Sequence, residues 1–174
     1  MQLTDIHPTF ALFFGVLLAE RGIELVIARR NERWLKARGG QEYGQRLTRI
    51  IVLFHILWLA GFFTEASMTG ARPQVSPIFP FLALAVLQAG RYWCIASLGR
   101  YWNTKVIVVP DAPLQRRGPY RWLRHPNYWI VRAELFAYPL LFGCWRTALI
   151  GGVVNLVLLH FRIRQEEEAL RYGS

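Results

Sequence analysis

Residues 117–129 read RGPYRWLRHPNYW and lie between two strongly apolar parts of the chain. This short segment combines turn-forming residues with cations, a histidine and aromatic rings. Pro119 and Pro126 fix the backbone at two points, because proline sets its own φ angle and moves the preceding residue away from helical geometry. A polar segment held this stiffly between apolar blocks is costly unless it binds something. We therefore expect residues 117–129 to form part of a binding site.

Apolar residues make up 53% of the 174 residues and fall in long blocks. Three blocks are each about long enough to cross roughly 30 Å of hydrocarbon as a helix, namely residues 10–27, 47–63 and 78–98. Two shorter blocks, residues 128–142 and 147–161, are separated by a tight turn, which predicts a short helical hairpin. The sequence predicts an all-α integral membrane protein of about five transmembrane helices, with a single domain over residues 1–174.

The chain has a formal net charge of +10, and its cations flank the apolar blocks. Five spans place three connections on one side of the membrane, and these carry Arg29, Arg30, Arg33, Lys36, Arg38, Arg46, Arg100, Lys105, Arg116, Arg117, Arg121, Arg124, Arg162, Arg164 and Arg171. The opposite side has only Arg72 and Arg146. By the positive-inside rule, residues 117–129 and the C-terminus face the cytoplasm and the N-terminus lies outside. This arrangement indicates anionic lipid headgroups, and not a nucleic acid, as the partner of the cations.

The first apolar block is expected to remain in the protein as a helix. No basic stretch precedes it, and Glu20, Arg21 and Glu24 interrupt its later half, so it lacks the layout of a cleavable signal. Cys94 and Cys144 lie in or near predicted helices without the spacing of metal ligands. We therefore expect neither a disulfide framework nor a metal site.

Several ionisable residues lie inside the predicted spans, where they are costly to place. Arg21 and Glu24 are three residues apart and share a helical face, so we expect an ion pair between them. Arg91 either extends to the membrane interface or faces a cavity. Glu134 is expected to face inward, and Arg132, two residues before it, cannot share its face.

A second polar element follows the last apolar block, where residues 162–170 read RIRQEEEAL. The signature formed by GPY at residues 118–120 and RHPNY at residues 124–128 resembles that of the isoprenylcysteine carboxyl methyltransferase family. Members of that family are integral membrane enzymes that use S-adenosylmethionine. Residues 162–170 resemble the Arg-Ile-x-x-Glu-Glu-x-x-Leu element that closes the cofactor pocket in this family. The two elements together, in this order and at the same predicted depth, are more specific than either one alone.

Further segments resemble one branch of this family. Residues 97–110 read SLGRYWNTKVIVVP, and with residues 29–32 and 38–42 they are similar to the bacterial branch associated with O-methylation of long-chain alkylpyrones. The resemblance covers nearly the whole chain. From their pattern, residues 97–110 predict an amphipathic helix followed by a short extended stretch on the membrane surface, with Tyr101 and Trp102 as interface anchors.

The resemblance implies a site for S-adenosylmethionine at the cytoplasmic face. The carboxylate of this cofactor suits arginine, its ammonium and ribose suit glutamate, and its adenine suits an aromatic ring. By resemblance, His125 and the paired Glu166 and Glu167 are the principal cofactor contacts. Gly118 is expected to let the backbone approach the cofactor. The complete set of candidate cofactor residues is Lys105, Gly118, Tyr120, Arg124, His125, Pro126, Tyr128, His160, Arg164, Glu166 and Glu167.

Methyl transfer requires a nucleophilic oxygen that is aligned with the sulfonium methyl group and shielded from water. A cation beside that oxygen can orient it. The candidates for catalytic roles are Arg91, Asn103, Arg132 and Glu134. His55 is expected to be a hydrogen-bonded interior histidine, with substrate contact as the alternative.

We therefore expect an S-adenosylmethionine-dependent O-methyltransferase in the bacterial inner membrane. Its lipophilic, membrane-borne acceptor is either a prenylcysteine-type carboxylate or an alkylpyrone enol. Two alternative enzymes stay open: NADPH-dependent sterol or steroid-type reductases carry a similar Arg-His-Pro-x-Tyr element, and phospholipid N-methyltransferases share the cofactor and a membrane site. A non-catalytic scaffold would leave His125 and the glutamates without a purpose.

Overall fold

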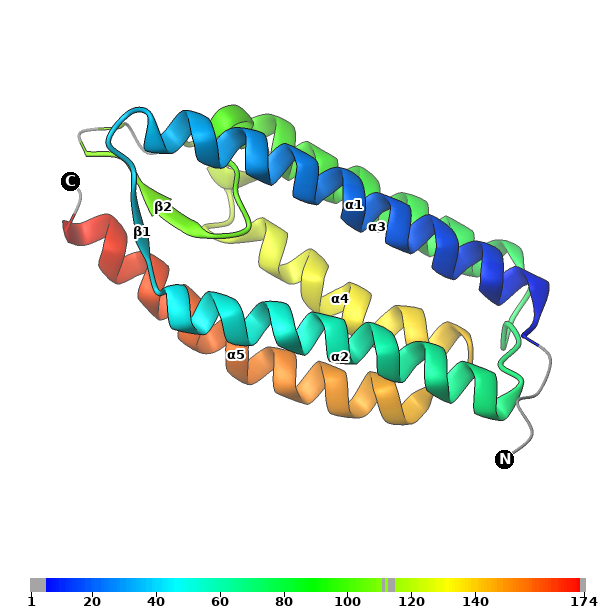
Figure 1. The fold of residues 1–174 in the computed structure, drawn as a ribbon. Helices are drawn as coiled ribbons and strands as arrows, with labels where there is room; N and C mark the ends of the chain where they lie inside the picture. Colours follow the sequence, from blue (N-terminus) through cyan, green and yellow to red (C-terminus); the bar gives the residue numbers. More distant parts are fainter. Residues whose placement is uncertain (1–5, 111, 113–114, 173–174) are drawn as a thin grey trace.

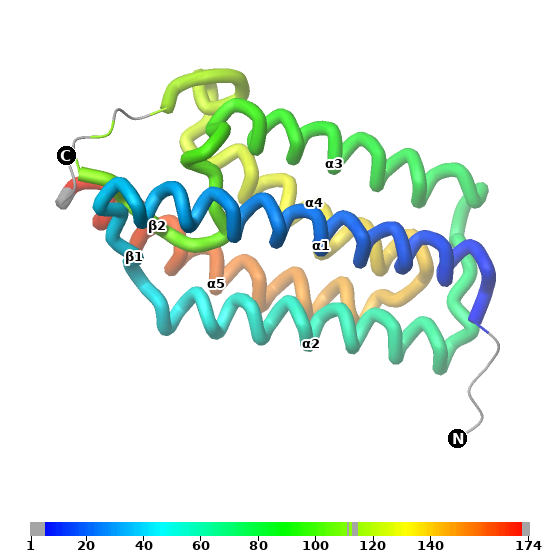
Figure 2. Tube along the Cα trace, turned by 45° about the horizontal axis from the view of Figure 1, so that its top comes forward, coloured from blue at the N-terminus to red at the C-terminus, as the bar shows by residue number. Residues whose placement is uncertain are grey.

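The computed structural model describes residues 6–110, 112 and 115–172, and within them five long helices form one elongated bundle (Figures 1 and 2). The helices are α1 (Pro8–Lys36), α2 (Gln45–Thr69), α3 (Ile78–Leu98), α4 (Pro126–Leu141) and α5 (Trp145–Tyr172). Helix α4 ends at a turn in which Gly143 has a φ of 73°, and α5 returns beside it. The predicted helical fold is confirmed, including the closing hairpin.

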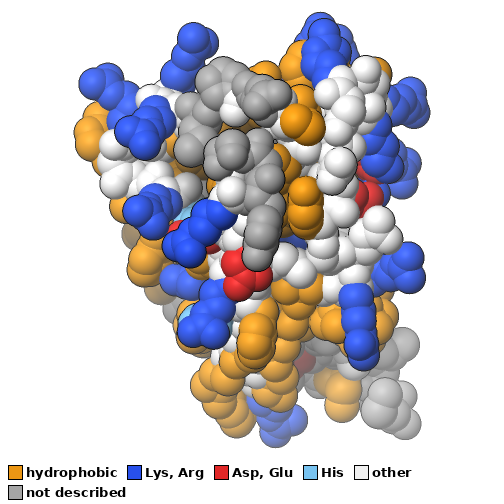
Figure 3. Space-filling model, turned by 90° about the vertical axis from the view of Figure 1, so that its left-hand side faces the viewer, with side chains coloured by type: hydrophobic (Ala, Val, Ile, Leu, Met, Phe, Trp, Pro, Cys, Tyr) orange, Lys and Arg blue, Asp and Glu red, His pale blue; other side chains and the backbone are white. Residues whose placement is uncertain are grey.

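The two ends of the bundle differ in what they carry. One end holds the short strands β1 (Gln41–Tyr43) and β2 (Val106–Val108), the one-turn helices η1 (Gly99–Tyr101) and η2 (Gly118–Arg121), and the end of α5 (Figure 1). The other end holds the start of α1, the α2–α3 connection and the α4–α5 turn. The three predicted basic connections therefore lie together. Figure 3 shows this basic end, with Lys and Arg side chains spread around its outline.

The outer surface of the bundle is apolar, as expected for a protein surrounded by lipid. Leu57, Val86 and Ile150, on three different helices, are 61%, 62% and 65% exposed. By length and composition, three of the described helices can cross a membrane: α2, α3 extended to Tyr101, and α5. Helix α1 carries charges in its middle, and α4 has only 16 residues. The chain is therefore a multi-pass membrane protein.

An aromatic core fills the bundle toward the end that lacks the strands. The Phe10 ring meets Phe62 and Phe142 edge-on, each at a centroid distance of 5.2 Å. Phe13 packs against the fully buried Tyr138 at 5.3 Å. Edge-to-face pairs of this kind are favoured beyond simple burial of apolar area. This core fixes α1, α2 and α4 relative to one another at one end, which leaves the basic end to carry the polar residues.

Two adjacent glycines let α5 approach both of its neighbours closely. A methyl group on Gly151 would collide with the Trp58 ring of α2, and one on Gly152 would collide with the Phe136 ring of α4. Since glycine has no Cβ, both large rings can lie against the α5 backbone. The close packing sets the register of α5 against α2 and α4, and hence the residues that face each other at the basic end.

Residues 97–110 differ from the predicted amphipathic helix. Helix α3 ends at Leu98, Gly99 has a φ of 55°, and η1 provides a single turn. The predicted extended stretch is β2, which pairs antiparallel with β1 so that Gln41 lies opposite Val108. Strands of three residues are too short to give a recognisable alternation, so the sequence did not predict the pairing.

Trp102 is not an interface anchor, because it is only 2% exposed. It packs with Ala28 of α1 and Ile95 of α3. The cause is Asn31, whose Nδ2 donates to the backbone oxygens of Gly99 at 3.2 Å and Trp102 at 2.7 Å. These two hydrogen bonds hold the turn after α3 against α1 and direct the indole inward.

Candidate functional site

The two polar elements of the sequence meet at the basic end of the bundle. His125 has a non-helical backbone, with a φ of −131° and a ψ of 60°, and Pro126 begins α4, in agreement with the preference of proline for the first turn of a helix. Helix α5 has 28 residues and is about 42 Å long at 1.5 Å per residue, so its last turns extend past the hydrocarbon region. Those turns place Glu166 and Glu167 beside the start of α4.

We name His125, Tyr128, Glu166 and Glu167 the histidine–glutamate cluster. Tyr128 donates its hydroxyl hydrogen to Glu166 Oε2. His125 Nε2 lies 3.4 Å from Glu167 Oε1, and His125 Nδ1 lies 3.8 Å from Glu166 Oε2. The His125 and Tyr128 rings are stacked at 5.4 Å with an angle of 16° between their planes. Each carboxylate keeps about a third of its side-chain area exposed, so both retain acceptor capacity for a ligand.

Three further residues surround this cluster. Arg124 Nη1 lies 3.5 Å from Glu167 Oε1, with its side chain largely in solvent. Arg162 is buried and donates to Thr48 Oγ1 at 2.9 Å and to the Thr104 oxygen at 2.8 Å. Asn127 Oδ1 is buried without a hydrogen-bond partner among the described residues. Arg162 and Asn127 belong to the two sequence motifs, but sequence reasoning did not place either of them in the site.

The turn η2 positions Tyr120 against α3. The Tyr120 hydroxyl is hydrogen-bonded with the Cys94 thiol, and it also interacts electrostatically with Glu166. Burial raises the pKa of the Tyr120 phenol well above its usual value, and the neighbouring Cys94 and Glu166 raise it further. Tyr120 therefore keeps its proton at neutral pH and can act as a hydrogen-bond donor.

Gly118 has a φ of 54°, in the region that favours glycine. A Cβ at this position would collide with Ser97 Oγ, and it would lie 3.0 Å from Trp93 Nε1. The close approach at Gly118 is therefore between η2 and α3. This packing explains why residue 118 is a glycine, and the sequence did not predict it. The expected approach of the Gly118 backbone to a cofactor stays a prediction.

Two arginines and two glutamates form an ion-pair network between α1, α3 and α4, in which Arg21 is partly exposed and the other three residues are buried. Arg21 donates to Glu24 Oε2 at 2.8 Å and to Glu134 Oε1 at 2.9 Å. Arg91 Nη1 donates to Glu134 Oε2 at 2.8 Å, and Arg91 Nε is in ion-pair contact with Glu24 without the alignment of a hydrogen bond. We name this network the ionic tetrad.

The ionic tetrad can be compared with the predictions made for the charged residues inside the spans. The predicted pair of Arg21 and Glu24 is confirmed, and so is the inward orientation of Glu134. Arg91 is 7% exposed and faces the bundle interior, so it does not extend to the interface. Because two cations and two carboxylates cancel, the tetrad satisfies the requirement that charges in a membrane be paired.

Asn103 and Lys105 make contacts that occupy their polar groups. The Asn103 Nδ2 group donates to the Ala28 oxygen at 2.9 Å, and its Oδ1 accepts from the Lys105 backbone N–H at 2.9 Å. The Lys105 ammonium lies 2.8 Å from Glu32 and 3.3 Å from Glu42. These contacts fasten the strand pair to α1. They give both residues a structural role, and no contact of either side chain with the histidine–glutamate cluster is among these interactions.

The structure does not bring four other candidates into the cluster. The Arg132 guanidinium lies 4.8 Å from the ring centre of Trp129, which is exposed on the outer surface. Arg164 and His160 are exposed on α5, and the His160 ring packs edge-on against Phe161. His55 Nδ1 lies 2.8 Å from the Ile51 oxygen, in agreement with the predicted interior hydrogen bond.

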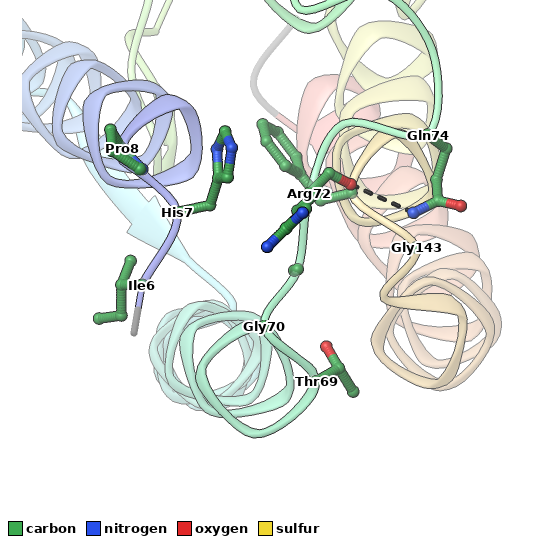
Figure 4. Close-up of a pocket in the computed structure, with 10 residues that line it drawn as sticks. Ile6, His7, Pro8, Thr69, Gly70, Arg72, Gln74 and Gly143 are labelled. Atoms are coloured by element: carbon green, nitrogen blue, oxygen red, sulfur yellow. Dashed lines mark hydrogen bonds between the residues drawn. The ribbon is translucent and has the colours of Figure 1, made fainter. Parts of the chain in front are cut away.

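A hollow of about 710 Å³ lies at the opposite end of the bundle (Figure 4). It is bordered by the start of α1, the end of α2 and the α4–α5 turn, with His7, Arg72 and Gln74 among its polar residues. Among the described residues, its lining contains no carboxylate. The hollow therefore lacks the acidic partners of the histidine–glutamate cluster. Within the part of the chain that the structure describes, no group of three or more His, Cys, Asp or Glu could hold a metal ion.

Comparisons with known proteins agree with this arrangement. Chain residues 80–172 match the sequence profile of the isoprenylcysteine carboxyl methyltransferase family. The chain is 36% identical over 165 residues to the uncharacterized protein YpbQ of Bacillus subtilis, covering 95% of this chain and 98% of that protein. It is 29% identical over 164 residues to an uncharacterized protein of Haemophilus influenzae, covering 91% and 93%. No solved structure matches the chain significantly.

The matched region begins in α3 and includes η2, α4 and α5, so it contains every member of the histidine–glutamate cluster. It also contains two members of the ionic tetrad, Arg91 and Glu134. The chain belongs to the isoprenylcysteine carboxyl methyltransferase family.

Proposed function

We propose that this protein is an S-adenosylmethionine-dependent O-methyltransferase that acts on a lipophilic acceptor in the membrane. The single observation that carries the proposal is the meeting of the signature with the acidic end of α5 in the histidine–glutamate cluster. Family membership supports the same class of reaction. The acceptor is either a prenylcysteine-type carboxylate or an alkylpyrone enol.

The residues around the cluster fit the polar groups of S-adenosylmethionine. Glu166 and Glu167 are half-buried carboxylates that can accept from its ammonium and ribose hydroxyls. Arg124 is free on the solvent side to meet its carboxylate, apart from a long contact with Glu167. The unpartnered Asn127 Oδ1 supplies one more buried acceptor. The stacked rings of His125 and Tyr128 offer an aromatic surface of the kind that adenine prefers.

When bound, this cofactor supplies a methyl group on a sulfonium, and the bond from sulfur to carbon breaks as the acceptor oxygen bonds to carbon. The protein has to align the oxygen and exclude water. Arg91 and Glu134 are the best-placed candidates for positioning the acceptor, because they are paired in the bundle interior near the histidine–glutamate cluster. Glu134 follows Tyr128 by six residues on α4, so it lies about 9 Å further along the helix at 1.5 Å per residue. Arg132, whose guanidinium lies over the exposed Trp129 ring, and Asn103, whose side chain is bound to backbone groups, are less suited to this task.

The charge distribution supports an orientation with the cluster toward the cytoplasm of a bacterial inner membrane. Arginines at this end include Arg116, Arg117, Arg121 and Arg124, all on the connection that carries the signature. The anionic lipids of the inner leaflet attract a group of arginines of this kind. The cofactor would then reach the histidine–glutamate cluster from the cytoplasm, and a greasy acceptor would reach it from the bilayer.

The test is methyl transfer by protein purified in detergent, with S-adenosylmethionine labelled on its methyl group. The acceptors to compare are an alkylpyrone, a farnesylated cysteine and phosphatidylethanolamine. We expect label on one of the first two, in a form that base hydrolyses if it is a carboxyl ester and that resists hydrolysis if it is an enol ether. Label only on the amine of phosphatidylethanolamine would identify an N-methyltransferase and contradict the proposal.

A further inference from the structure

A larger polar region surrounds the ionic tetrad, and every helix of the bundle contributes to it. We name it the polar centre, and it comprises Arg21 and Glu24 of α1, His55 of α2, Gln88 and Arg91 of α3, Glu134 and Tyr138 of α4, and Asn155 of α5. Gln88 lies one turn before Arg91 on the same buried face of α3. Tyr138 lies one turn after Glu134 on the same buried face of α4.

The register of α5 against α2 places Asn155 at the level of His55. Arg162 donates to Thr48 Oγ1 at 2.9 Å, which makes these two residues opposite partners in an antiparallel pair. His55 is seven residues after Thr48, and Asn155 is seven residues before Arg162. The contact of Gly151 with the Trp58 ring, one turn further along, continues the same register. Asn155 and His55 therefore lie at one depth.

Three neutral side chains in this polar centre have polar atoms without hydrogen-bond partners among the described residues. They are both amide atoms of Gln88, the hydroxyl of Tyr138 and Nδ2 of Asn155. Their side chains are 5%, 0% and 1% exposed. A buried polar atom left without a hydrogen bond destabilises the folded protein, and the bilayer core contains no water that could bind it. Four such atoms at a similar depth indicate a place that receives a polar ligand.

The charges and donors of the polar centre indicate the chemistry of that ligand. The cations Arg21 and Arg91 are already paired with Glu24 and Glu134, so an anionic ligand would have to displace a carboxylate. Leaving a carboxylate unpaired in the bundle interior is strongly unfavourable. In contrast, the amide of Gln88 and the hydroxyl of Tyr138 can each donate and accept a hydrogen bond, and Asn155 Nδ2 can donate. This inventory suits an uncharged group that has both a donor and an acceptor.

We propose that the polar centre receives the head of the methyl acceptor, and that Gln88, Tyr138 and Asn155 recognise it by hydrogen bonds. This inference rests on the proposed function. The head enters uncharged and carries both a hydrogen-bond donor and an acceptor. As its hydroxyl oxygen bonds to the methyl carbon, the O–H bond breaks and the proton is released to water at the basic end of the bundle. It lies on the membrane side of the histidine–glutamate cluster, about 9 Å from Tyr128 along α4 at 1.5 Å per residue. The apolar tail extends between the helices toward lipid.

Two isomeric amphiphiles test this inference directly. Dodecyl 4-hydroxybenzoate is neutral at pH 7 and presents a hydroxyl and a carbonyl, whereas 4-dodecyloxybenzoate is its carboxylate isomer with the same chain length. Binding of each probe is measured by calorimetry on the full-length protein in detergent, with S-adenosylhomocysteine present. We expect the neutral isomer to bind at least about tenfold more tightly, because the tetrad has no spare cation for the carboxylate.

Three variants complete the experiment: Gln88→Met, Tyr138→Phe and Asn155→Leu, each of which removes polar atoms and largely keeps the volume. Each is expected to weaken binding of the neutral isomer by about fivefold or more, as the loss of one hydrogen bond implies, with unchanged affinity for S-adenosylhomocysteine. Val86→Ala, on the lipid-facing side of α3, is the control and should bind both probes like the wild type.

Several results would overturn the inference. These are tighter binding of the carboxylate isomer, failure of both isomers to bind the wild type, or wild-type affinity for the neutral isomer in all three variants. Binding of S-adenosylhomocysteine is a separate readout. If the wild type does not bind it, the proposed function fails; if it binds but the probes behave in one of these ways, only the acceptor subsite fails.

Discussion

Tyr128 donates a hydrogen bond to Glu166 across 38 residues of sequence, and this contact joins the two polar elements into one site. Tyr128 is fixed by its place in the first turn of α4, which Pro126 starts. Glu166 is fixed by the packing of α5 against α2 and α4, to which Gly151 and Gly152 are essential. The site thus depends on the hairpin as a whole, and its geometry can be tested by changes inside and outside the cluster.

His125→Ala and Glu167→Ala are each expected to weaken binding of S-adenosylhomocysteine while the protein stays folded. Each change removes one group of the cluster, and a hydrogen bond to a charged group contributes about 1.5–3 kcal/mol, or roughly 10- to 100-fold in affinity. Calorimetry measures the affinity, and thermal unfolding in detergent checks the fold. Glu168→Ala is the matched control, because this glutamate is exposed on the same helix and should retain wild-type affinity. Unchanged affinity in both cluster variants would remove the basis for the site assignment.

Glu134→Ala is expected to destabilise the protein strongly. It leaves Arg21 and Arg91 with Glu24 as their only tetrad carboxylate, and loss of one partner of a buried ion pair typically costs about 3–5 kcal/mol. Thermal unfolding in detergent should show a large fall in Tm. The control is Glu20→Ala, because Glu20 accepts a hydrogen bond from Tyr92 outside the tetrad.

The double variant Arg91→Leu/Glu134→Leu provides the second half of this test. It removes one charge of each sign, so the remaining Arg21 and Glu24 still form a neutral pair. We expect its Tm to lie above that of Glu134→Ala. A single variant as stable as the wild type would contradict the buried network.

Gly118→Ala is expected to loosen η2 and lower the affinity for S-adenosylhomocysteine. The new methyl group would collide with Ser97 Oγ, and a φ of 54° costs alanine about 1 kcal/mol more than glycine. Adding Ser97→Gly removes the colliding side chain and should restore part of the loss, measured as Tm and affinity together. If the second change restores nothing, the packing of η2 on α3 is not the reason for the glycine.

Lys105→Met is expected to lower the free energy of unfolding slightly at neutral and mildly alkaline pH, and to have no such effect at strongly alkaline pH. Hydrogen bonding to Glu32 raises the pKa of the Lys105 ammonium above its ordinary value of 10.5, with a further contribution from Glu42. A raised pKa means that the stabilisation is complete below 10.5 and is lost as pH rises through the folded-state pKa. The ion pairs are partly exposed, so the effect should stay below about 1 kcal/mol. A difference in Tm between wild type and variant that grows on raising the pH from 9 to 11 would contradict this account.

The sequence was sufficient for the bundle because its signals are long and repetitive. Apolar blocks predict the helices, Pro126 marks the start of α4, and the positions of the cations predict that three connections share one end. Arg21 and Glu24 could be paired because helical periodicity places residues three apart on one face. Local patterns of this kind require no knowledge of which helices touch.

The remaining features depend on contacts between distant parts of the chain. Trp102 is buried because Asn31, 71 residues earlier, holds its backbone. Asn103 and Lys105 were predicted as site residues from their polar groups alone, and the sequence did not show that Ala28, Glu32 and Glu42 bind those groups. The sequence could not predict that the unpaired amide atoms of Gln88 and Asn155 belong to one polar region. Their location depends on the register between helices, and an isolated amide in an apolar span gives no indication of its neighbours.

The proposed methyltransferase site is best tested by calorimetric titration of the wild-type protein in detergent with S-adenosylhomocysteine and, separately, with NADPH. We expect saturable binding of S-adenosylhomocysteine with a stoichiometry near one, and no binding of NADPH. Binding of NADPH alone would contradict it and would make the Arg-His-Pro-Asn-Tyr segment at residues 124–128 part of a reductase site.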